Sequence, residues 1–210
     1  MIASIARTYE RWAPDYDRRW RRYTDVTLGV LLDHLVLDRA PDILDVGCGT
    51  GTLLARLRGR APQAHLLGVD VNPAMLRIAR AKLEGLAVDL RHGTAYHLPV
   101  ADRAVDVVTM ASVVHYLKRP SIACAEVRRV LRPGGTLVMV DYVPRGGGGS
   151  VMDGLIRLYD RGHVRGRDLH ETQAMLRWAG LVVTRASSFA IDRLCHGILV
   201  TASAPPLAER

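Results

Sequence analysis

The chain has 210 residues, of which 49% are hydrophobic and 24% charged, a composition that predicts a single domain with a buried core. Its apolar runs, such as residues 28–32, are far shorter than the roughly 20 residues that cross a bilayer. Its three cysteines lack CxxC spacing and Cys/His clustering, which argues against a disulfide scaffold and a metal site. The formal net charge of +8 attracts anionic partners in general, whether a small substrate, an acidic membrane surface or a nucleic acid, and without a signal peptide's apolar region we expect a cytoplasmic protein.

Residues 1–38 are expected to form an N-terminal helical cap that is rich in aromatic and basic side chains. Five aromatic residues have spacings of 3, 4, 4 and 3, which place them on one helical face: Tyr9, Trp12, Tyr16, Trp20 and Tyr23. Pro14 predicts a short turn, with the helix beginning near Asp15. This face either packs on the rest of the domain, closes over a bound ligand, or rests peripherally on an anionic membrane with Trp20 at the interface.

Residues 41–142 are expected to form a ligand-binding core. Short β-like runs alternate there with helical patterns, and the runs are residues 43–46, 65–70, 86–92, 104–110 and 136–142. This alternation predicts a parallel sheet with helices on both faces.

Residues 143–204 are expected to hold variable helices and an edge hairpin. The Gly-Gly-Gly-Gly-Ser run 146–150 predicts a flexible segment. It is also identical to a common engineered linker, so we assign it no function. Asp168 and Glu171 form a capping-box pattern at the start of a helix. Two later runs can pair antiparallel, residues 181–186 and 196–202. The sequence therefore predicts one α/β domain with a Rossmann-like, doubly wound, seven-stranded sheet that is mostly parallel.

A glycine-rich turn lies between the first β-like run and the helical pattern after it, with the sequence Asp45-Val46-Gly47-Cys48-Gly49-Thr50-Gly51. Glycines permit positive φ and let the backbone approach a ligand, while the following helix offers unpaired N–H groups. Asp70 ends the next run 19 residues after Gly51, where a carboxylate accepts hydrogen bonds from ribose hydroxyls. These features predict a nucleotide-like cofactor held by the turn and by Asp70.

The glycine spacing bears on which cofactor binds. The dinucleotide fingerprint is GxGxxG, whereas the third glycine here comes one residue early, at Gly51. A carboxylate at Asp45 disfavours a pyrophosphate but can pair with the ammonium of a methionine moiety. S-adenosylmethionine is therefore favoured over NAD, with an NAD-dependent oxidoreductase and a non-catalytic cofactor-binding protein as the alternatives.

The segment ILDVGCGTG, residues 43–51, resembles motif I of the class I S-adenosylmethionine-dependent methyltransferases. The resemblance runs in order over roughly residues 9–142 and includes VDVVTMASVVHYL at 105–117 and LRPGG at 131–135. It implies methyl transfer from S-adenosylmethionine, and it implies cofactor contacts at Val71, Met75, Gly93, Thr94, Ala95 and Ala111. Thr94 stands where the family commonly has an aspartate that meets the adenine amino group.

The opening TYERWAPDYD, residues 8–17, resembles that of family members that methylate quinone precursors and phospholipids. In those members the segment closes over the cofactor. The resemblance implies that Tyr9 and Tyr16 touch the methionine end of the cofactor and that Tyr9 and Trp12 face the substrate.

Methyl transfer from a sulfonium is an in-line displacement, which needs a base only where the acceptor must lose a proton. His115 is the candidate base, because it follows the fourth predicted strand and a neutral imidazole takes up a proton near pH 7. The alternative is a structural histidine at a helix start, and Tyr116 is expected on the substrate side. We expect a small-molecule or lipid acceptor, including a phospholipid amine at an anionic membrane; the scattered arginines disfavour a nucleic acid.

Overall fold

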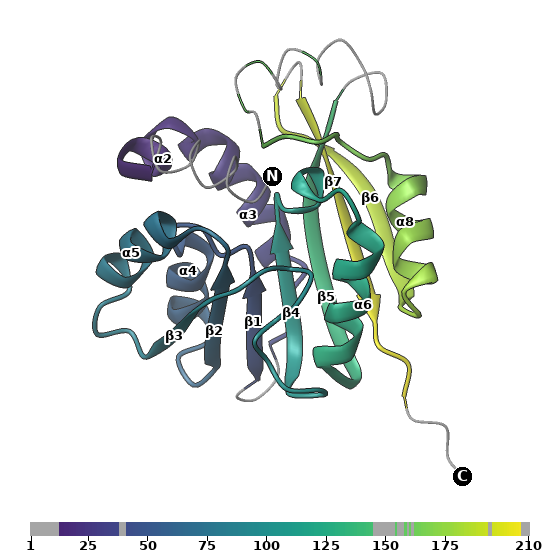
Figure 1. Ribbon diagram of the computed structural model, residues 1–210, viewed down its shortest axis with the longest axis horizontal. Helices are drawn as coiled ribbons and strands as arrows, with labels where there is room; N and C mark the ends of the chain where they lie inside the picture. Colours follow the sequence, from purple (N-terminus) through teal and green to yellow (C-terminus); the bar gives the residue numbers. More distant parts are fainter. Residues whose placement is uncertain are drawn as a thin grey trace.

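The computed structural model describes residues 13–37, 41–144, 154, 158, 160, 162–192 and 195–206. Within them, helices cover both faces of one sheet (Figure 1), whose strand order is β3-β2-β1-β4-β5-β7-β6. The strands are β1 (Asp42–Val46), β2 (His65–Asp70), β3 (Val88–His92), β4 (Val105–Ala111), β5 (Leu131–Pro144), β6 (Val182–Ala190) and β7 (Cys195–Ser203). The helices are η1 (Ala13–Asp15), α2 (Tyr16–Arg19), α3 (Arg21–Leu32), α4 (Thr52–Arg60), α5 (Pro73–Lys82), η2 (Val114–Tyr116), α6 (Pro120–Val130) and α8 (Leu169–Trp178).

The first five strands are parallel to one another, and β7 pairs antiparallel with both β5 and β6. This confirms the predicted seven-stranded, mostly parallel sheet with an antiparallel edge pair. The predicted capping box is also confirmed, because the Asp168 carboxylate accepts the N–H of Glu171 at 2.8 Å and the Glu171 carboxylate accepts the N–H of Asp168 at 3.2 Å.

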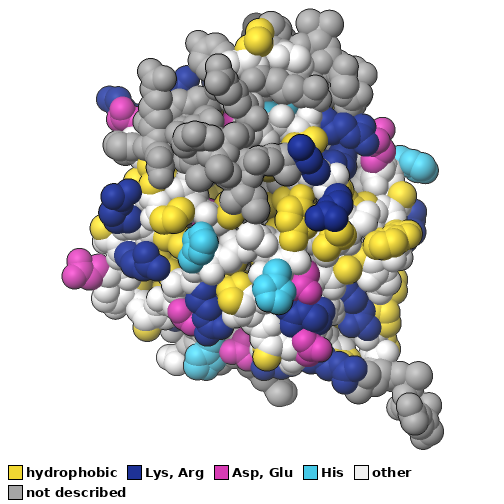
Figure 2. All heavy atoms as spheres, in the orientation of Figure 1, with side chains coloured by type: hydrophobic (Ala, Val, Ile, Leu, Met, Phe, Trp, Pro, Cys, Tyr) yellow, Lys and Arg dark blue, Asp and Glu magenta, His cyan; other side chains and the backbone are white. Residues whose placement is uncertain are grey.

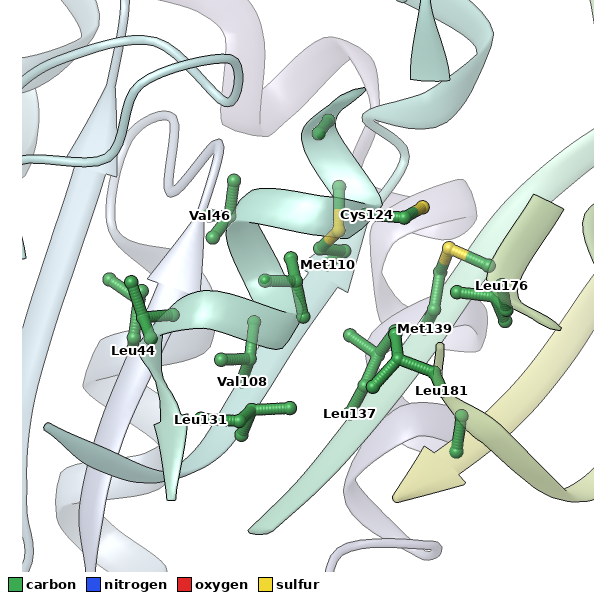
Figure 3. Packing of buried hydrophobic residues seen from close by; sticks show 14 of the residues in the cluster. Leu44, Val46, Val108, Met110, Cys124, Leu131, Leu137, Met139, Leu176 and Leu181 are labelled. Atoms are coloured by element: carbon green, nitrogen blue, oxygen red, sulfur yellow. The ribbon is translucent and has the colours of Figure 1, made fainter. Parts of the chain in front are cut away.

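Two cores flank the sheet, and successive residues of each central strand alternate between them. Ile43 and Val107 pack with α3, α4 and α5 on one face, whereas Leu44 and Val108 pack with α6 and α8 on the other (Figure 3). Side chains on a strand point alternately to opposite faces, so strands that are apolar on both sides require helices on both sides. The sequence pattern and the layer structure therefore agree.

Several element boundaries differ from the prediction, and β6 ends at Ala190, four residues after the predicted run 181–186. The N-terminal helix is interrupted at Trp20 (φ −104°, ψ 11°), which lets Tyr16 pack against Met75 of α5 while Tyr23 reaches Ser112 beyond β4. Strand β5 begins at Leu131, before the predicted residue 136, with an irregular register opposite Val105 and Val107. Tyr9, Trp12 and the glycine run 146–150 lie outside the described residues.

The strand order places a topological switch point between β1 and β4. From β1 the chain crosses to β2 on one side, and β4 lies on the other. In open parallel sheets of this kind, ligands bind in the crevice at the carboxyl ends of the two central strands. The glycine-rich turn and the Ala111–Val113 segment both lie at that end. Among the described residues, we find no helix long and apolar enough to cross a membrane.

Candidate functional site

A cleft opens at this switch point. In open parallel sheets, small-molecule and cofactor sites are common at such a switch point. Its walls come from α2, the glycine-rich turn, the ends of β2 and β4, the turn after β3, and η2. The residues that line it are Tyr16, Gly47, Gly49, Val69, Asp70, Val71, Asn72, Met75, Gly93, Thr94, Ala95, Tyr96, Ala111, Ser112, Val113, Tyr116 and Leu117.

The glycine-rich turn owes its path to backbone conformations that other residues resist. Gly47, Gly49 and Gly51 have φ of 73°, 53° and 78°. A Cβ on Gly47 would lie 2.5 Å from the Val113 side chain. Position 47 therefore requires glycine both for its positive φ and for the lack of space for a side chain. The N–H groups of Gly47 and Cys48 donate to the Val69 carbonyl at 2.7 and 3.1 Å. The turn is therefore fixed to the end of β2, and its exposed backbone faces the cleft.

Asp70 ties this turn to α5 while lining the cleft. One carboxylate oxygen accepts the N–H of Gly49 at 2.8 Å, and the other accepts the N–H of Asn72 at 2.8 Å. Burial raises the pKa of the Asp70 carboxyl, and the backbone donors act in the opposite direction. Each carboxylate oxygen has further acceptor capacity. Asp70 can therefore accept hydrogen bonds from a ligand without giving up its backbone partners.

The walls beyond Asp70 are largely apolar. Val71 and the buried Met75 lie on one side, and the Gly93–Ala95 segment forms another part of the cleft. The cleft thus combines apolar surface, a carboxylate at a strand end and a glycine backbone. This combination fits a nucleoside, with an aromatic base in the apolar part and vicinal hydroxyls at the carboxylate. S-adenosylmethionine has these parts, so the described residues fit the cofactor that the sequence predicts.

Some predicted cofactor residues lie behind the cleft surface. Asp45, Cys48 and Gly51 are not among the described residues that line it. Cys48 is buried, and burial together with the Asp45 and Asp70 carboxylates raises the pKa of its thiol, which disfavours a role as nucleophile. A Cβ on Gly51 would meet the Leu83 side chain at 2.7 Å, so Gly51 serves the packing of the turn on α5.

Asp45 is a buried carboxyl behind the turn. Its side chain is 2% exposed and accepts a hydrogen bond of 2.8 Å from the Thr109 hydroxyl. Burial raises the pKa of Asp45 to about 7, the hydrogen bond from Thr109 lowers it, and the nearby Asp70 carboxylate raises it. The carboxyl therefore titrates in the folded protein close to neutral pH.

Asp45→Asn is expected to flatten the dependence of folding stability on pH. The folded protein holds a proton on Asp45 between the unfolded pKa of about 4 and the folded value, so stability falls as pH rises through this window. Asparagine still accepts from Thr109 but does not ionise. Urea unfolding from pH 5 to 8 should show wild type losing about 2–4 kcal/mol more than the variant. Parallel profiles would contradict the buried titration, since the two proteins share every other ionisable group.

The cluster around His115 lies next to the cleft, on the side of β5. His115 is 7% exposed and is not among the described residues that line the cleft. Its Nδ1 lies 2.5 Å from Oδ1 of the buried Asp141, whose Oδ2 accepts the N–H of Val114 at 2.6 Å. Asp141 therefore fixes both the imidazole and the backbone of η2, and the tautomer that donates from Nδ1 leaves Nε2 as an acceptor.

Tyr116 links this cluster to the cleft. Its ring lies 4.1 Å from that of His115, and its hydroxyl donates to the buried Asp160 at 2.6 Å. His163, also buried, has its ring 5.3 Å from the His115 ring. Imidazole and phenol groups thus gather beside the part of the cleft that Tyr116 lines. Among the described residues, no group of three or more His, Cys, Asp or Glu side chains is placed to hold a metal ion.

Six lining residues were not predicted from the sequence: Val69, Asn72, Tyr96, Ser112, Val113 and Leu117. The sequence does indicate a structural role for Asn72, because an asparagine followed by a proline is typical of the start of a helix. In the structure its side chain accepts a hydrogen bond from the N–H of Ala74. Ser112 has a positive φ of 59° and a hydrogen bond of 2.8 Å to Tyr23, which nothing in the local sequence indicates.

Comparison with known proteins agrees with this geometry. Residues 44–139 match the family described as "Methyltransferase domain". A demethylmenaquinone methyltransferase of Thermus thermophilus is 42% identical over 131 residues, which are 61% of this chain and 56% of the relative. A malonyl-[acyl-carrier protein] O-methyltransferase of Hahella chejuensis is 35% identical over 137 residues, 65% of this chain and 48% of the relative.

Solved structures share the fold over most of the chain. A putative methyltransferase of Haloferax volcanii, solved in complex with a methyltransferase activator, superposes with a TM-score of 0.82 at 22% identity over 94% of this chain and 97% of that one. The chain spans about half the length of the two curated relatives.

Proposed function

We propose that the chain is an S-adenosylmethionine-dependent methyltransferase that methylates a small aromatic acceptor, because residues 44–139 match a methyltransferase domain and a curated methyltransferase is 42% identical over 131 residues. When bound, the cofactor supplies an electrophilic methyl group on a sulfonium. The observation that carries the proposal is the cleft itself, in which Asp70 and the glycine backbone lie beside apolar walls. The remaining rate enhancement comes from positioning the acceptor and excluding water.

The roles of the cleft residues follow from their chemistry. Asp70 would accept hydrogen bonds from the ribose hydroxyls, and Val71 and Met75 would hold the adenine. Thr94 would offer its hydroxyl in place of a carboxylate. Gly47 and Gly49 would meet the methionine end through their backbone, near Ala111 and Tyr16, all of which line the cleft. Asp45 would act from behind the turn, as a carboxylate that favours a nearby ammonium.

The acceptor side favours a flat, weakly acidic molecule. Tyr116 lines the cleft, with the buried rings of His115 and His163 beside it, and an aromatic ring in the wall of a cleft can stack with a flat ligand. The quinone-precursor activity in the name of the Thermus relative agrees with an acceptor of this kind. His115, oriented by Asp141, would take the proton from the acceptor.

A lipid amine is the second candidate acceptor. Trp20 is 37% exposed at the break between α2 and α3, and Arg19 and Arg21 on either side are exposed. Exposed Trp and Arg side chains suit the interface of an anionic membrane. On the face shown in Figure 2, the described Lys and Arg side chains are interspersed with Asp and Glu, a distribution that lacks the continuous basic stripe of a nucleic-acid site.

An acceptor panel tests the proposal. We expect acceptor-dependent release of S-adenosylhomocysteine with quinol precursors, and none with phosphatidylethanolamine vesicles, with or without anionic lipid. Turnover confined to anionic vesicles would favour the lipid amine instead. Calorimetric titration of the protein with S-adenosylhomocysteine and with NADH forms the control, because binding of NADH alone would contradict the methyltransferase assignment.

A further inference from the structure

Helix α2 contributes Tyr16 to the cleft but has little packing of its own. It spans four residues, of which none is buried. Its apolar contacts are those of Tyr16 and the preceding Ala13 with Ala74, Met75 and Ile78 of α5. In Figure 1 it lies above α4 and α5, apart from the sheet. Among the described residues, the other side-chain contacts that join α2 to the elements around the cleft are polar.

Those contacts converge on Asp17. One of its carboxylate oxygens accepts from the hydroxyl of Thr50 at 2.6 Å, and the other accepts from Nζ of Lys82 at 2.5 Å. Lys82 also donates to the hydroxyls of Thr50 and Thr52, at 3.1 and 2.7 Å. We call the group formed by Asp17, Thr50, Thr52 and Lys82 the clamp.

The clamp joins α2 to the glycine-rich turn and to two helices, α4 and α5. Thr50 belongs to the glycine-rich turn, Thr52 begins α4, and Lys82 ends α5. Asp17 thus places a carboxylate at the N-terminus of α4, where the helix dipole favours negative charge. Burial alone would raise the pKa of Asp17, but hydrogen bonds from Lys82 and Thr50 hold it below its usual range. The carboxylate is therefore ionised throughout the neutral range.

We propose that the clamp is a positioning device that holds α2 and Tyr16 against the cleft and thereby slows the release of the cofactor. Successive side chains on a helix point about 100° apart, so Tyr16 can line the cleft while Asp17 accepts a hydrogen bond from Thr50 of the glycine-rich turn. Neither Asp17 nor Lys82 is among the described residues that line the cleft. The proposal rests on the proposed function for the identity of the ligand, whereas the attachment of α2 is independent of it.

The same segment offers a matched control. Asp15 and Arg18 also form an ion pair, at 2.9 Å, but their side chains are 67% and 83% exposed and lie three residues apart. This pair joins α2 only to η1, which directly precedes it in the chain. Asp15→Asn therefore removes a carboxylate from the segment without touching the clamp.

The first measurement is hydrogen exchange in the free protein, on a peptide covering residues 13–24. Asp17→Asn is expected to speed exchange there by about 3- to 10-fold, as for the loss of one partly buried ion pair, while Asp15→Asn leaves it unchanged. The difference between wild type and Asp17→Asn should shrink in 1 M salt, because screening weakens the wild-type pair. Equal exchange in wild type and Asp17→Asn at low salt would overturn the proposal.

The second measurement is the dissociation of S-adenosylhomocysteine by stopped-flow fluorescence. We expect the dissociation rate to rise about 3- to 10-fold in Asp17→Asn, and to return toward the wild-type rate when Lys82→Asp is combined with Asp17→Lys. An unchanged rate in Asp17→Asn would overturn the gating role. Failure of the ligand to bind wild type would instead count against the proposed function, while hydrogen exchange still decides whether the clamp holds α2.

Discussion

Asp70→Ala is expected to weaken the binding of S-adenosylhomocysteine by at least about 100-fold. The variant loses the acceptor for the ribose hydroxyls and also releases the N–H of Gly49, which Asp70 holds at 2.8 Å. Hydrogen bonds to a charged group contribute about 1.5–3 kcal/mol each, and each 1.4 kcal/mol changes affinity about tenfold. Calorimetric titration measures the change directly.

Asp70→Asn separates charge from shape. An amide has only one acceptor oxygen, so its NH₂ group must face the N–H of either Gly49 or Asn72, both of which Asp70 now accepts. We therefore expect this near-isosteric variant to lose most of the affinity as well. Asp89→Ala is the matched control, because Asp89 is an exposed carboxylate on the adjacent strand β3 and pairs with Arg91. Affinity within threefold of wild type in both Asp70 variants would remove Asp70 from the cofactor site.

Local patterns in the sequence predict the fold, and they also predict the glycine-rich turn and Asp70, which the structure places at the cleft. Strand and helix periods are repeated within a few residues, and the glycines at 47, 49 and 51 stand in the turn where positive φ is needed. Asp70 follows from the same logic, because the end of the strand after the turn lies beside it in any parallel βαβ unit. These features could be predicted because each depends on its neighbours in the chain.

Contacts between distant residues could not be predicted in this way. The aromatic stripe alone predicts a continuous helix. In the structure, the helix is interrupted at Trp20, so that Tyr16 packs against α5 whereas Tyr23 forms a hydrogen bond with Ser112. Lys82 has the period of an ordinary exposed residue at a helix end, yet it meets Asp17 across 65 positions of sequence. Hydrophobic periodicity indicates which face of a helix is buried, but it does not indicate which charged side chain will pair with a residue such as Lys82.

The acceptor half shows the same limit. The sequence predicts His115 as a candidate base from its place after the fourth strand, but it does not indicate its partner Asp141, which lies on the next strand. The parallel register that pairs Ala111 with Val140 brings Asp141 beside η2, where it accepts from the backbone of Val114 as well as from His115. A buried aspartate in an otherwise apolar strand was the available signal.

His115→Gln is expected to lower kcat by about 10²- to 10⁴-fold for an acceptor that must lose a proton, the usual contribution of a general base. Glutamine can still donate to Asp141 but cannot take up a proton, so the affinity for S-adenosylhomocysteine should stay within twofold of wild type. The dependence of kcat on pH should flatten in the variant. These measurements separate a catalytic role from a structural one, which would change affinity and folding stability together.

His163→Gln decides between the two neighbouring imidazoles. His163 lies 5.3 Å from His115 by ring centroids and is equally buried, so it is the next group that could receive the proton. If His115 is the base, His163→Gln keeps the pH dependence of kcat even where it alters KM for the acceptor. If His163→Gln flattens the profile and His115→Gln does not, the roles are exchanged, and Asp141 serves to fix η2 beside the cleft. Turnover unchanged in both variants would mean that the acceptor reacts without a protein base, as an amine or an already ionised group does.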